Sequence, residues 1–324
     1  MPELACPQQC SFCDQRQISG KASFPAVEEI IQKIETHLAS FTCEDREVEI
    51  AFFGGTFTGL PLITQEKYLA IARNYIGMGF VTGIRLSTRP DYIDEENLHL
   101  LKLNGVTTIE LGAQSLDDEV LIRCNRGHTA QQVADAAEMI NRFKFSLGLQ
   151  MMIGLPGDTP EKSYTTAQKI IALGALETRI YPCLVIKNTK LAKEYAEGFY
   201  KAMELSEAVG LSAELLLLFE QHGVKVIRLG LHRSENLHNG AMITGPYHIS
   251  FKELVLTEIW NKILLAEIGE TNSESIHIQI NPAELNFAIG YQSKNKKVLM
   301  NRFRQVKFSG NNSLIGRDFI LNSQ

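Results

Sequence analysis

Three cysteines lie close together near the start of the chain. Cys6, Cys10 and Cys13 fall within eight residues, in the spacing Cys-x3-Cys-x2-Cys. Thiolates on one short loop suit an iron–sulfur cluster, in which three of them would hold three irons and leave the fourth open. The alternatives are chance and a structural zinc site, but zinc sites usually close with four ligands. Because no histidine lies within twenty residues of Cys13, the spacing favours an iron–sulfur site.

Glycines, hydroxyls and charged residues follow five short apolar segments that are typical of strands. The segments are residues 48–53, 84–86, 108–111, 145–152 and 178–184. The motifs that follow them are Gly54-Gly55-Thr56, Ser87-Thr88-Arg89-Pro90, Gly112-Ala113-Gln114-Ser115, Gly154-Leu155-Pro156-Gly157 and the run from Cys183 to Lys187. Right-handed crossovers place the carboxyl ends of parallel strands on one face. The motifs are therefore predicted to share an enzyme face.

Segments with helical periodicity alternate with these strands. They cover residues 26–40, 64–77, 94–104, 130–143 and 160–173. This alternation predicts an α/β fold with a parallel sheet or barrel. Beyond residue 200 we expect a helix over 205–222, a strand over 224–230, a helix over 251–268 and a strand over 275–280. The predicted domains are 1–200, an extension over 201–270 that completes the core, and a small basic α+β module over 271–324.

Composition and charge describe an ordinary globular protein with an uneven charge distribution. The 324 residues are 44% hydrophobic and 21% charged, which excludes wholesale disorder. No apolar run approaches the ~18 residues of a membrane span, and no secretory signal begins the chain, so we expect a cytoplasmic protein without membrane contact. The net charge of −5 divides into +6 over residues 290–324 and −11 over the rest. The scattered Cys43, Cys124 and Cys183 are typical of small hydrophobic residues.

Several of these motifs resemble the radical S-adenosylmethionine (SAM) superfamily. The cysteine motif, with Phe12 before Cys13, is similar to its cluster signature, and Gly54-Gly55-Thr56 is similar to its glycine motif. Residues 10–15, 53–58, 87–91, 110–115, 125–129, 154–157 and 181–187 also resemble the radical SAM domain of the Elongator catalytic subunit and its shorter bacterial relatives. The resemblance covers about residues 6–260 and implies a partial (βα)6 barrel.

The resemblance also implies cofactors and roles. A [4Fe–4S] cluster would bind SAM through its open iron and cleave it to a 5′-deoxyadenosyl radical that abstracts hydrogen, with oxygen sensitivity and a flavodoxin- or ferredoxin-type reductant. The implied cofactor-binding residues are Phe12, Gly54, Gly55, Thr56, Ser87, Arg89, Glu110, Gln114, Arg126 and Ile153. Glu110 would be costly to bury alone, so we expect a ligand or an arginine beside it. Lys187 and Cys183 are candidates to face the substrate. For each residue, an ordinary turn, surface or core role is the alternative.

Two departures from the family pattern stand out. Only five residues, one of them Pro2, precede Cys6, where the family has a strand. We therefore expect a barrel that lacks its first strand, and lower stability than a version extended upstream. The acetyltransferase domain of the Elongator subunit has no counterpart, and the basic tail, residues 290–324, stands in its place. Residues 281–282 and 289–295 resemble a KH-type clamping loop with Ser293 at the second glycine, although a solvated cationic face is the alternative.

These features favour a radical SAM enzyme, acting on tRNA through the basic tail. One alternative is a small-molecule substrate, by analogy with porphyrin-forming relatives that share similar motifs, which is an analogy of fold alone. The other is a truncated, inactive copy that serves as a scaffold. The three cysteines, the glycine motif and Arg126 argue against the scaffold, whereas the missing strand argues for it.

Overall fold

The computed structural model describes residues 8–14, 25–42, 46–231, 240–268 and 273–323. The chain packs into two compact units. The first comprises residues 1–204 and 218–247, and the second comprises residues 205–217 and 248–324. The domain boundaries expected at residues 200 and 270 stay a prediction, because compact packing is only one mark of a domain.

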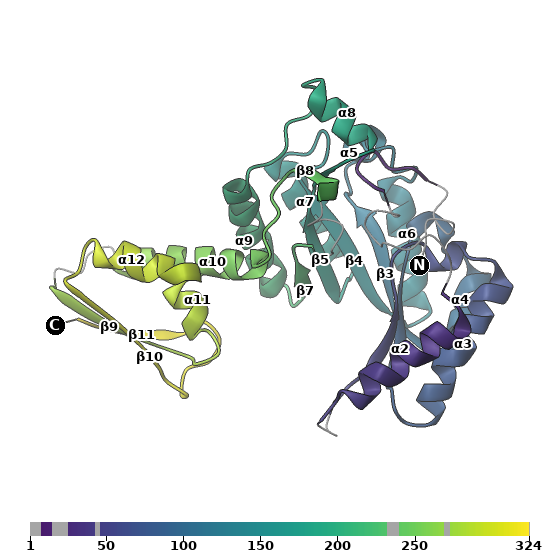
Figure 1. Cartoon of the computed structure of the whole chain (residues 1–324), viewed down its shortest axis with the longest axis horizontal. Coiled ribbons are helices and arrows are strands. Elements are labelled where there is room, and N and C mark those ends of the chain that lie inside the picture. Colours follow the sequence, from purple (N-terminus) through teal and green to yellow (C-terminus); the bar gives the residue numbers. More distant parts are fainter. Residues whose placement is uncertain (1–7, 15–24, 43–45, 232–239, 269–272, 324) are drawn as a thin grey trace. The chain divides into compact units, whose positions relative to one another are not determined.

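A curled sheet of six parallel strands forms the centre of the first unit (Figure 1). The strand order is β1-β2-β3-β4-β5-β7, and every neighbouring pair is parallel. The strands are Glu49–Phe52 (β1), Gly83–Thr88 (β2), Val106–Gln114 (β3), Ser146–Ile153 (β4), Glu177–Pro182 (β5) and Lys225–Leu229 (β7). The predicted α/β half-barrel is confirmed.

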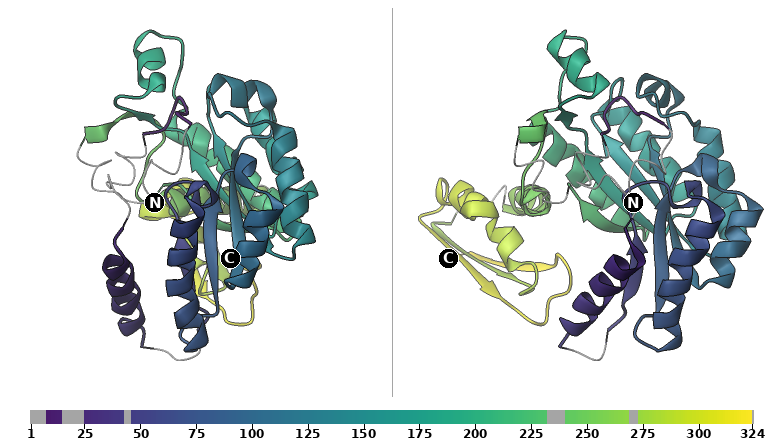
Figure 2. Two further views of the ribbon diagram at one scale, coloured as in Figure 1. Left: turned by 90° about the vertical axis from the view of Figure 1, so that its right-hand side faces the viewer. Right: turned by 45° about the vertical axis from the view of Figure 1, so that its right-hand side comes forward.

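Helices between the strands cover the outer side of this sheet (Figure 2). They are Leu62–Gly77 (α3), Glu95–Leu103 (α4), Ala130–Arg142 (α6) and Pro160–Ala172 (α7). Side-chain caps mark the starts of α4, α6 and α7. The Asp94 carboxylate accepts from the Asn97 amide at the start of α4, and Thr129 forms a capping box with Gln132 at the start of α6. The capped ends therefore hold the loops between strands and helices in fixed positions.

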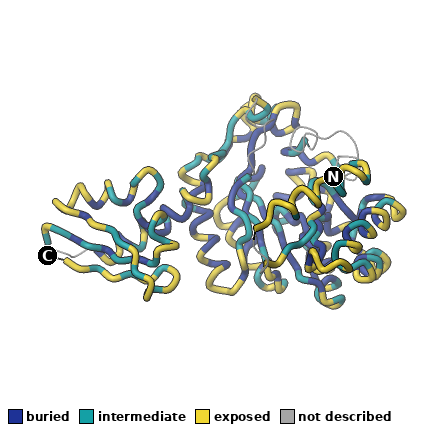
Figure 3. Tube along the Cα trace, turned by 60° about the horizontal axis from the view of Figure 1, so that its bottom comes forward, coloured by how far each residue is buried: buried dark blue, intermediate teal, exposed yellow. Residues whose placement is uncertain are grey.

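Along the strands, apolar residues that pack against the helices alternate with polar residues that face the concave side. Figure 3 shows that buried residues gather along the strands of the first unit. Among them, Ile84 and Leu86 of β2 and Ile109 and Leu111 of β3 are completely buried. Burying a side chain of this size contributes roughly 1.5–3 kcal/mol. The residues between them, such as Arg85, face the concave side of the sheet, where polar groups gather. The packed outer side thus makes the concave side a rigid platform.

Short elements complete the first unit. The helices are Val27–Ala39 (α2), Asp118–Arg123 (α5), Lys190–Ala196 (α8) and Leu205–Gln221 (α9), through which the division between the units runs. Val185–Ile186 (β6) and Met242–Thr244 (β8) pair antiparallel, and 3-10 turns lie at Phe57–Gly59 (η2) and Pro90–Tyr92 (η3). In the described part of the chain, β1 is hydrogen-bonded to β2 alone. The strand expected before the cluster loop falls on residues 1–7, which lie outside that part.

The second unit packs helices against one face of a three-stranded sheet, as the predicted C-terminal α+β module requires. Its elements are Phe251–Ile268 (α10), Ser275–Ile280 (β9), Leu285–Ile289 (α11), Tyr291–Ser293 (η5), Lys294–Met300 (α12), Gln305–Gly310 (β10) and Phe319–Ser323 (β11). The order is β10-β9-β11, with β10 parallel and β11 antiparallel to β9. Ile276, Ile278 and Ile280 pack with Trp260, whose Nε1 donates to Glu284 at 2.8 Å. The alternation predicted for this strand is confirmed.

Candidate active site

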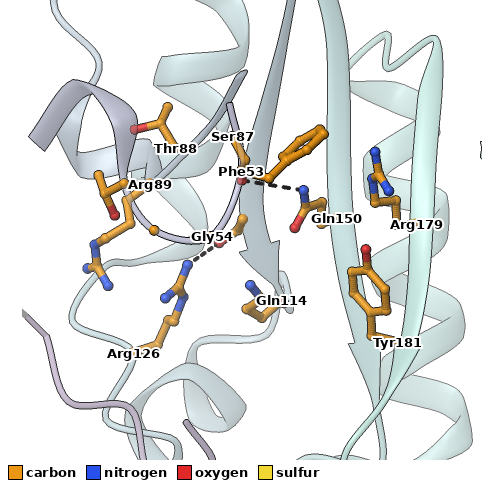
Figure 4. Close-up of a pocket in the computed structure, with 13 residues that line it drawn as sticks. Phe53, Gly54, Ser87, Thr88, Arg89, Gln114, Arg126, Gln150, Arg179 and Tyr181 are labelled. Carbon is orange, nitrogen blue, oxygen red and sulfur yellow. Dashed lines mark hydrogen bonds between the residues drawn. The ribbon is translucent and has the colours of Figure 1, made fainter. Parts of the chain in front are cut away.

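A cavity of about 240 Å³ opens at the carboxyl ends of strands β1 to β5 (Figure 4). Its lining comes from motifs that are far apart in the sequence. The lining residues are Phe53, Gly54, Gly55, Thr56, Ser87, Thr88, Arg89, Gly112, Gln114, Arg126, Gln150, Arg179 and Tyr181. The parallel sheet therefore gathers the strand-end motifs into one polar site, as the sequence predicted for an enzyme face.

The glycine motif forms one wall of the cavity. Gly54 and Gly55 have φ angles of 93° and 153°, which residues other than glycine rarely adopt. Thr56 is buried behind them, and the hydroxyls of Thr58 and Thr88 lie 2.5 Å apart. Because the two glycines carry no side chains, their peptide groups can approach a ligand closely.

Gln114 and Arg126 present buried polar atoms to the cavity. Gln114 ends β3 at an irregular register with β4 and has a φ of 66°. The Arg126 guanidinium donates to the Gly112 carbonyl at 2.5 Å and to Cys10 Sγ at 3.4 Å. Among the described residues, Gln114 Oε1 and Arg126 Nε are buried with no hydrogen-bond partner. An acceptor and a donor of this kind fit a ligand with hydroxyl and carboxylate groups.

Two neighbours stiffen this corner of the site. Arg89 is 3% exposed and forms a two-point ion pair with the Asp91 carboxylate, at 2.9 and 2.8 Å. Burial lowers the pKa of His128 to about 3, and the charges of Arg126 and Arg89 act in the same direction. The neutral His128 ring therefore bonds the Ala113 carbonyl through Nε2, at 3.2 Å. Arg89 lines the cavity, but much of its charge is already balanced.

Backbone hydrogen bonds hold the cysteine loop against the same end of the sheet. The Ser11 amide donates to the Cys124 carbonyl at 2.8 Å, and the Leu191 amide donates to the Ser11 carbonyl at 2.8 Å. Cys10 is buried and Cys13 is half-buried. Cys6 lies outside the described residues. Cys10 thus lies beside Arg126, next to the cavity, and the Cys13 amide donates to the Cys10 carbonyl at 3.1 Å on the same loop.

An ion network lies beneath the cavity. Glu110, 1% exposed, accepts from Arg85 Nη1 at 2.9 Å, from Arg179 Nε at 2.5 Å and from Gln150 Nε2 at 3.0 Å. Burial acts to lower the pKa of Arg85, but the carboxylates of Glu177 and Glu49 hold it well above its usual range. The arginine expected beside Glu110 is confirmed, and Glu110 supports the floor of the site.

Family models match most of the chain. A model described as the radical SAM superfamily matches residues 4–170, and one described as the Radical_SAM C-terminal domain matches residues 177–261. The chain belongs to the radical SAM superfamily. It is an enzyme of this class, and the fold and the glycine and cysteine motifs described above agree with that membership.

Radical SAM relatives with curated descriptions share the same region. An uncharacterised protein of Methanocaldococcus jannaschii is 30% identical over 227 residues, covering 66% of this chain and 68% of that protein. The tRNA uridine(34) acetyltransferase of the same organism is 32% identical over 183 residues, covering 50% and 34%. Elongator complex protein 3 of Schizosaccharomyces pombe is 26% identical over 263 residues, covering 74% and 47%. The chain spans about a third to a half of the length of the last two.

Solved structures share the fold of this chain. The archaeal Elp3 of Methanocaldococcus infernus, with residues 1–46 deleted, has a TM-score of 0.63 at 21% identity, covering 73% of this chain and 59% of that one. SuiB of Streptococcus suis has a TM-score of 0.51 at 13% identity, covering 72% and 48%. At these identities the similarity concerns the fold alone.

The radical SAM half-barrel brings together seven of the ten predicted cofactor residues, namely Gly54, Gly55, Thr56, Ser87, Arg89, Gln114 and Arg126. The other three lie outside the cavity lining. Phe12 packs in a hydrophobic cluster with Cys10, Ile153 is completely buried, and Glu110 belongs to the floor. All ten assignments stay predictions.

The two candidate catalytic residues also lie outside the lining. Cys183 packs in the cluster that contains Cys10, and burial raises the pKa of its thiol to about 12. A thiol with such a pKa is a weak nucleophile near neutral pH. The Lys187 amide donates to the Ala241 carbonyl at 2.8 Å, beside the β6–β8 pair. Their roles toward a substrate stay predictions.

Sequence reasoning missed the far wall of the cavity, formed by Gln150, Arg179 and Tyr181 (Figure 4). The guanidinium of Arg179 lies over the Phe53 ring, 4.9 Å from its centroid, so β5 and the end of β1 meet across the curled sheet. A signal was present, because Arg179 and Tyr181 alternate with the buried Thr178 and Ile180. Polar residues on one face of an otherwise buried strand indicate a polar cavity.

Proposed function

We propose that this radical SAM enzyme carries a [4Fe–4S] cluster on Cys6, Cys10 and Cys13 and binds SAM in the cavity, to modify RNA. With both bound, SAM cleavage supplies a 5′-deoxyadenosyl radical that abstracts a hydrogen atom from the substrate. The observation that carries the proposal is Arg126, which lines the cavity while its guanidinium touches Cys10 Sγ, and whose buried Nε has no hydrogen-bond partner in the described residues. One side chain would thereby join the two cofactors.

The remaining cofactor roles follow from the donors and acceptors in the cavity. Arg126 Nε is suited to the SAM carboxylate, because a guanidinium matches carboxylate geometry. Gln114 Oε1 is suited to a ribose hydroxyl, and the carbonyls of Gly54 and Gly55 are suited to the SAM ammonium group. The role of Thr56 is to hold that turn in place.

The other predicted contacts keep lesser roles. Ser87 and Arg89 would lie near the ribose or carboxylate, and Phe12 and Ile153 would shape the adenine side through their packing. We propose that a flavodoxin- or ferredoxin-type protein supplies the electron. Lys187 and Cys183 remain candidates on the substrate side.

The RNA part of the proposal rests on the relatives and on the second unit. The matched relatives include a tRNA uridine(34) acetyltransferase and Elongator complex protein 3, which points to tRNA modification as the process. The basic tail offers exposed cations, among them Lys297 and Lys307. Such cations favour phosphate contacts. The tail is therefore the proposed tRNA-binding surface.

Anaerobic reconstitution with iron and sulfide tests the cofactor part. The full chain should form 5′-deoxyadenosine from SAM with dithionite, and Cys10→Ala should lose this product together with most of its iron and its absorbance near 400 nm. Cys124→Ala is the matched control, since it removes a buried thiol outside the motif and should keep the iron. A chain that holds its cluster yet forms no 5′-deoxyadenosine would favour the scaffold alternative.

A further inference from the structure

Two arginines lie side by side on the concave face of the sheet. Arg179 of β5 is the direct partner of Arg228 of β7. Paired residues of neighbouring strands lie about 4.8 Å apart and point to the same side. Thr178 and Ile180, which flank Arg179, are buried on the opposite face, so Arg179 and Arg228 share the concave face.

The two guanidinium groups differ in how their charge is balanced. Arg179 forms a two-point ion pair with Glu110, at 2.5 and 2.9 Å, and lies over the Phe53 ring. Arg228 has no carboxylate partner in the described ranges, and its buried Nε has no hydrogen-bond partner there. Burying part of a cation, with one of its N–H donors unpartnered, costs free energy. A bound anion would offset that cost.

Tyr181 lines the cavity and lies on the same face of β5 as Arg179, whose strand partner is Arg228, so Arg228 borders the far wall from behind the cavity lining. Burial raises the pKa of the Tyr181 phenol, and the charges of Arg179 and Arg228 act in the opposite direction, since both lie near it. Burial likewise lowers the pKa of Arg228. At neutral pH the site therefore offers a phenol O–H and a guanidinium, and both are hydrogen-bond donors.

This wall is separate from the residues predicted to bind SAM. Gly54 and Arg126 lie on one side of the cavity, whereas Arg179 and Tyr181 lie on the other (Figure 4). Gln150 lies between them and is tied to Glu110 and Ser87, at 3.0 and 3.5 Å. The far wall therefore lies opposite the predicted SAM contacts, within the same cavity.

We propose that Arg228 and Tyr181 form a phosphate-binding subsite that holds the substrate beside the cofactor. The choice of phosphate over another oxyanion rests on the proposed RNA-modifying function, whereas the need for an anion rests on the charges alone. Arg228 acts here as a binding residue for a nucleotide phosphate. No bond is made or broken at this subsite.

Calorimetric titration of the anaerobically reconstituted full chain tests the subsite, with uridine 5′-monophosphate and uridine as probes. We expect the wild type to bind the monophosphate roughly tenfold more tightly than uridine, because a charge-assisted hydrogen bond is worth about that factor. Arg228→Gln should abolish the preference, and Arg228→Lys should keep part of it. Lys225→Gln, an exposed change on the same strand that removes the same charge, should keep all of it.

Two outcomes overturn the subsite. The first is equal binding of the two probes, or no binding of either, by the wild type. The second is a phosphate preference that survives in Arg228→Gln, which would place the phosphate elsewhere, such as on the basic tail. Both readouts are binding affinities, so failure of the subsite is distinguishable from failure of the proposed function, which is measured by 5′-deoxyadenosine formation.

Discussion

At the scale of single residues, Arg126 links two parts of the chain that meet at the cavity. Its guanidinium contacts the Cys10 sulfur, the Gly112 carbonyl and the cavity. A lysine could carry the charge but not this planar set of donors. This one side chain therefore ties the cysteine loop to the end of β3 beside the cavity.

Gly112→Ala should weaken SAM binding by displacing Arg126. A β-carbon at this position would lie 2.9 Å from Arg126 Nη2 and 3.1 Å from Gln114 Nε2, which are the flexible ends of side chains. Both ends can move, so the fold should persist while SAM affinity falls by roughly tenfold or more. Equilibrium binding of SAM to the reconstituted chain measures the change.

The control for this substitution is Gly210→Ala in helix α9, where nothing lies within 4 Å of the added carbon. Alanine is the better helix former by about 1 kcal/mol, so this variant should bind SAM normally and be no less stable. Unchanged SAM affinity in Gly112→Ala would argue against a binding role for the Arg126–Gln114 corner.

At the scale of elements, the loop between α11 and α12 is the most constrained segment of the second unit. Gly290, Gln292 and Ser293 have φ angles of 88°, 50° and 60°. The buried Asn295 donates to the carbonyls of Thr257 and Ala288, at 3.0 and 3.2 Å. These bonds hold Gln292 and Ser293 in a left-handed backbone conformation that is unfavourable by itself. The loop therefore has a fixed shape without a ligand.

Gly290→Ala should destabilise the second unit strongly. Its β-carbon would lie 2.9 Å from the backbone nitrogen of Asn295, which cannot move without breaking that anchor. Gly316→Ala is the control, because Gly316 also has a positive φ, 56°, but open space around it. The control should cost about 1 kcal/mol from backbone strain alone, and Gly290→Ala on the order of 2 kcal/mol more. Urea denaturation measures both, and equal costs would contradict the packing argument.

The sequence predicted elements more completely than it predicted contacts. Hydrophobic periodicity located the six strands of the large sheet, β9 and most helices, but not β6, β8, β10 and β11. The strand-end rule predicted that Gly54 and Gln114 share one face, and the family resemblance added Arg126. The sequence could not reveal that the sheet curls until Arg179 lies over the Phe53 ring, because that contact depends on accumulated twist across five strands. Short helices such as α5 and α8 also escaped prediction, since one or two turns give too few residues for a periodic signal.

At the scale of the whole molecule, opposite charges are separated along the chain. Residues 290–324 carry +6 and the remainder carries −11. No helix in the described ranges is both long enough and apolar enough to cross a membrane. The separation lets the basic tail, residues 290–324, approach a polyanion that the acidic remainder of the chain would repel.

Binding of tRNA should therefore depend steeply on salt. Each phosphate contact contributes about 0.7–0.9 to the slope of log affinity against log salt, so Lys296→Gln with Lys297→Gln should reduce that slope by about 1–2. Gel retardation at several salt concentrations provides the slope. The control is Lys33→Gln with Lys67→Gln, which removes the same charge from exposed positions of the first unit and should leave the slope unchanged. Absence of retardation at low salt would end the RNA part of the proposal.

The backbone ties of the cysteine loop have an evolutionary consequence. The loop is held through main-chain atoms of Ser11 and Gln9, the latter accepting from Asn125 Nδ2 at 2.9 Å. The Gln9 side chain is exposed and can vary while its carbonyl keeps this bond, whereas the Ser11 side chain is buried. The constraint falls instead on Asn125, which has a left-handed φ of 51° and supplies the side-chain donor. Selection for the shape of the loop would thus act on Asn125, more than a hundred positions downstream of the loop.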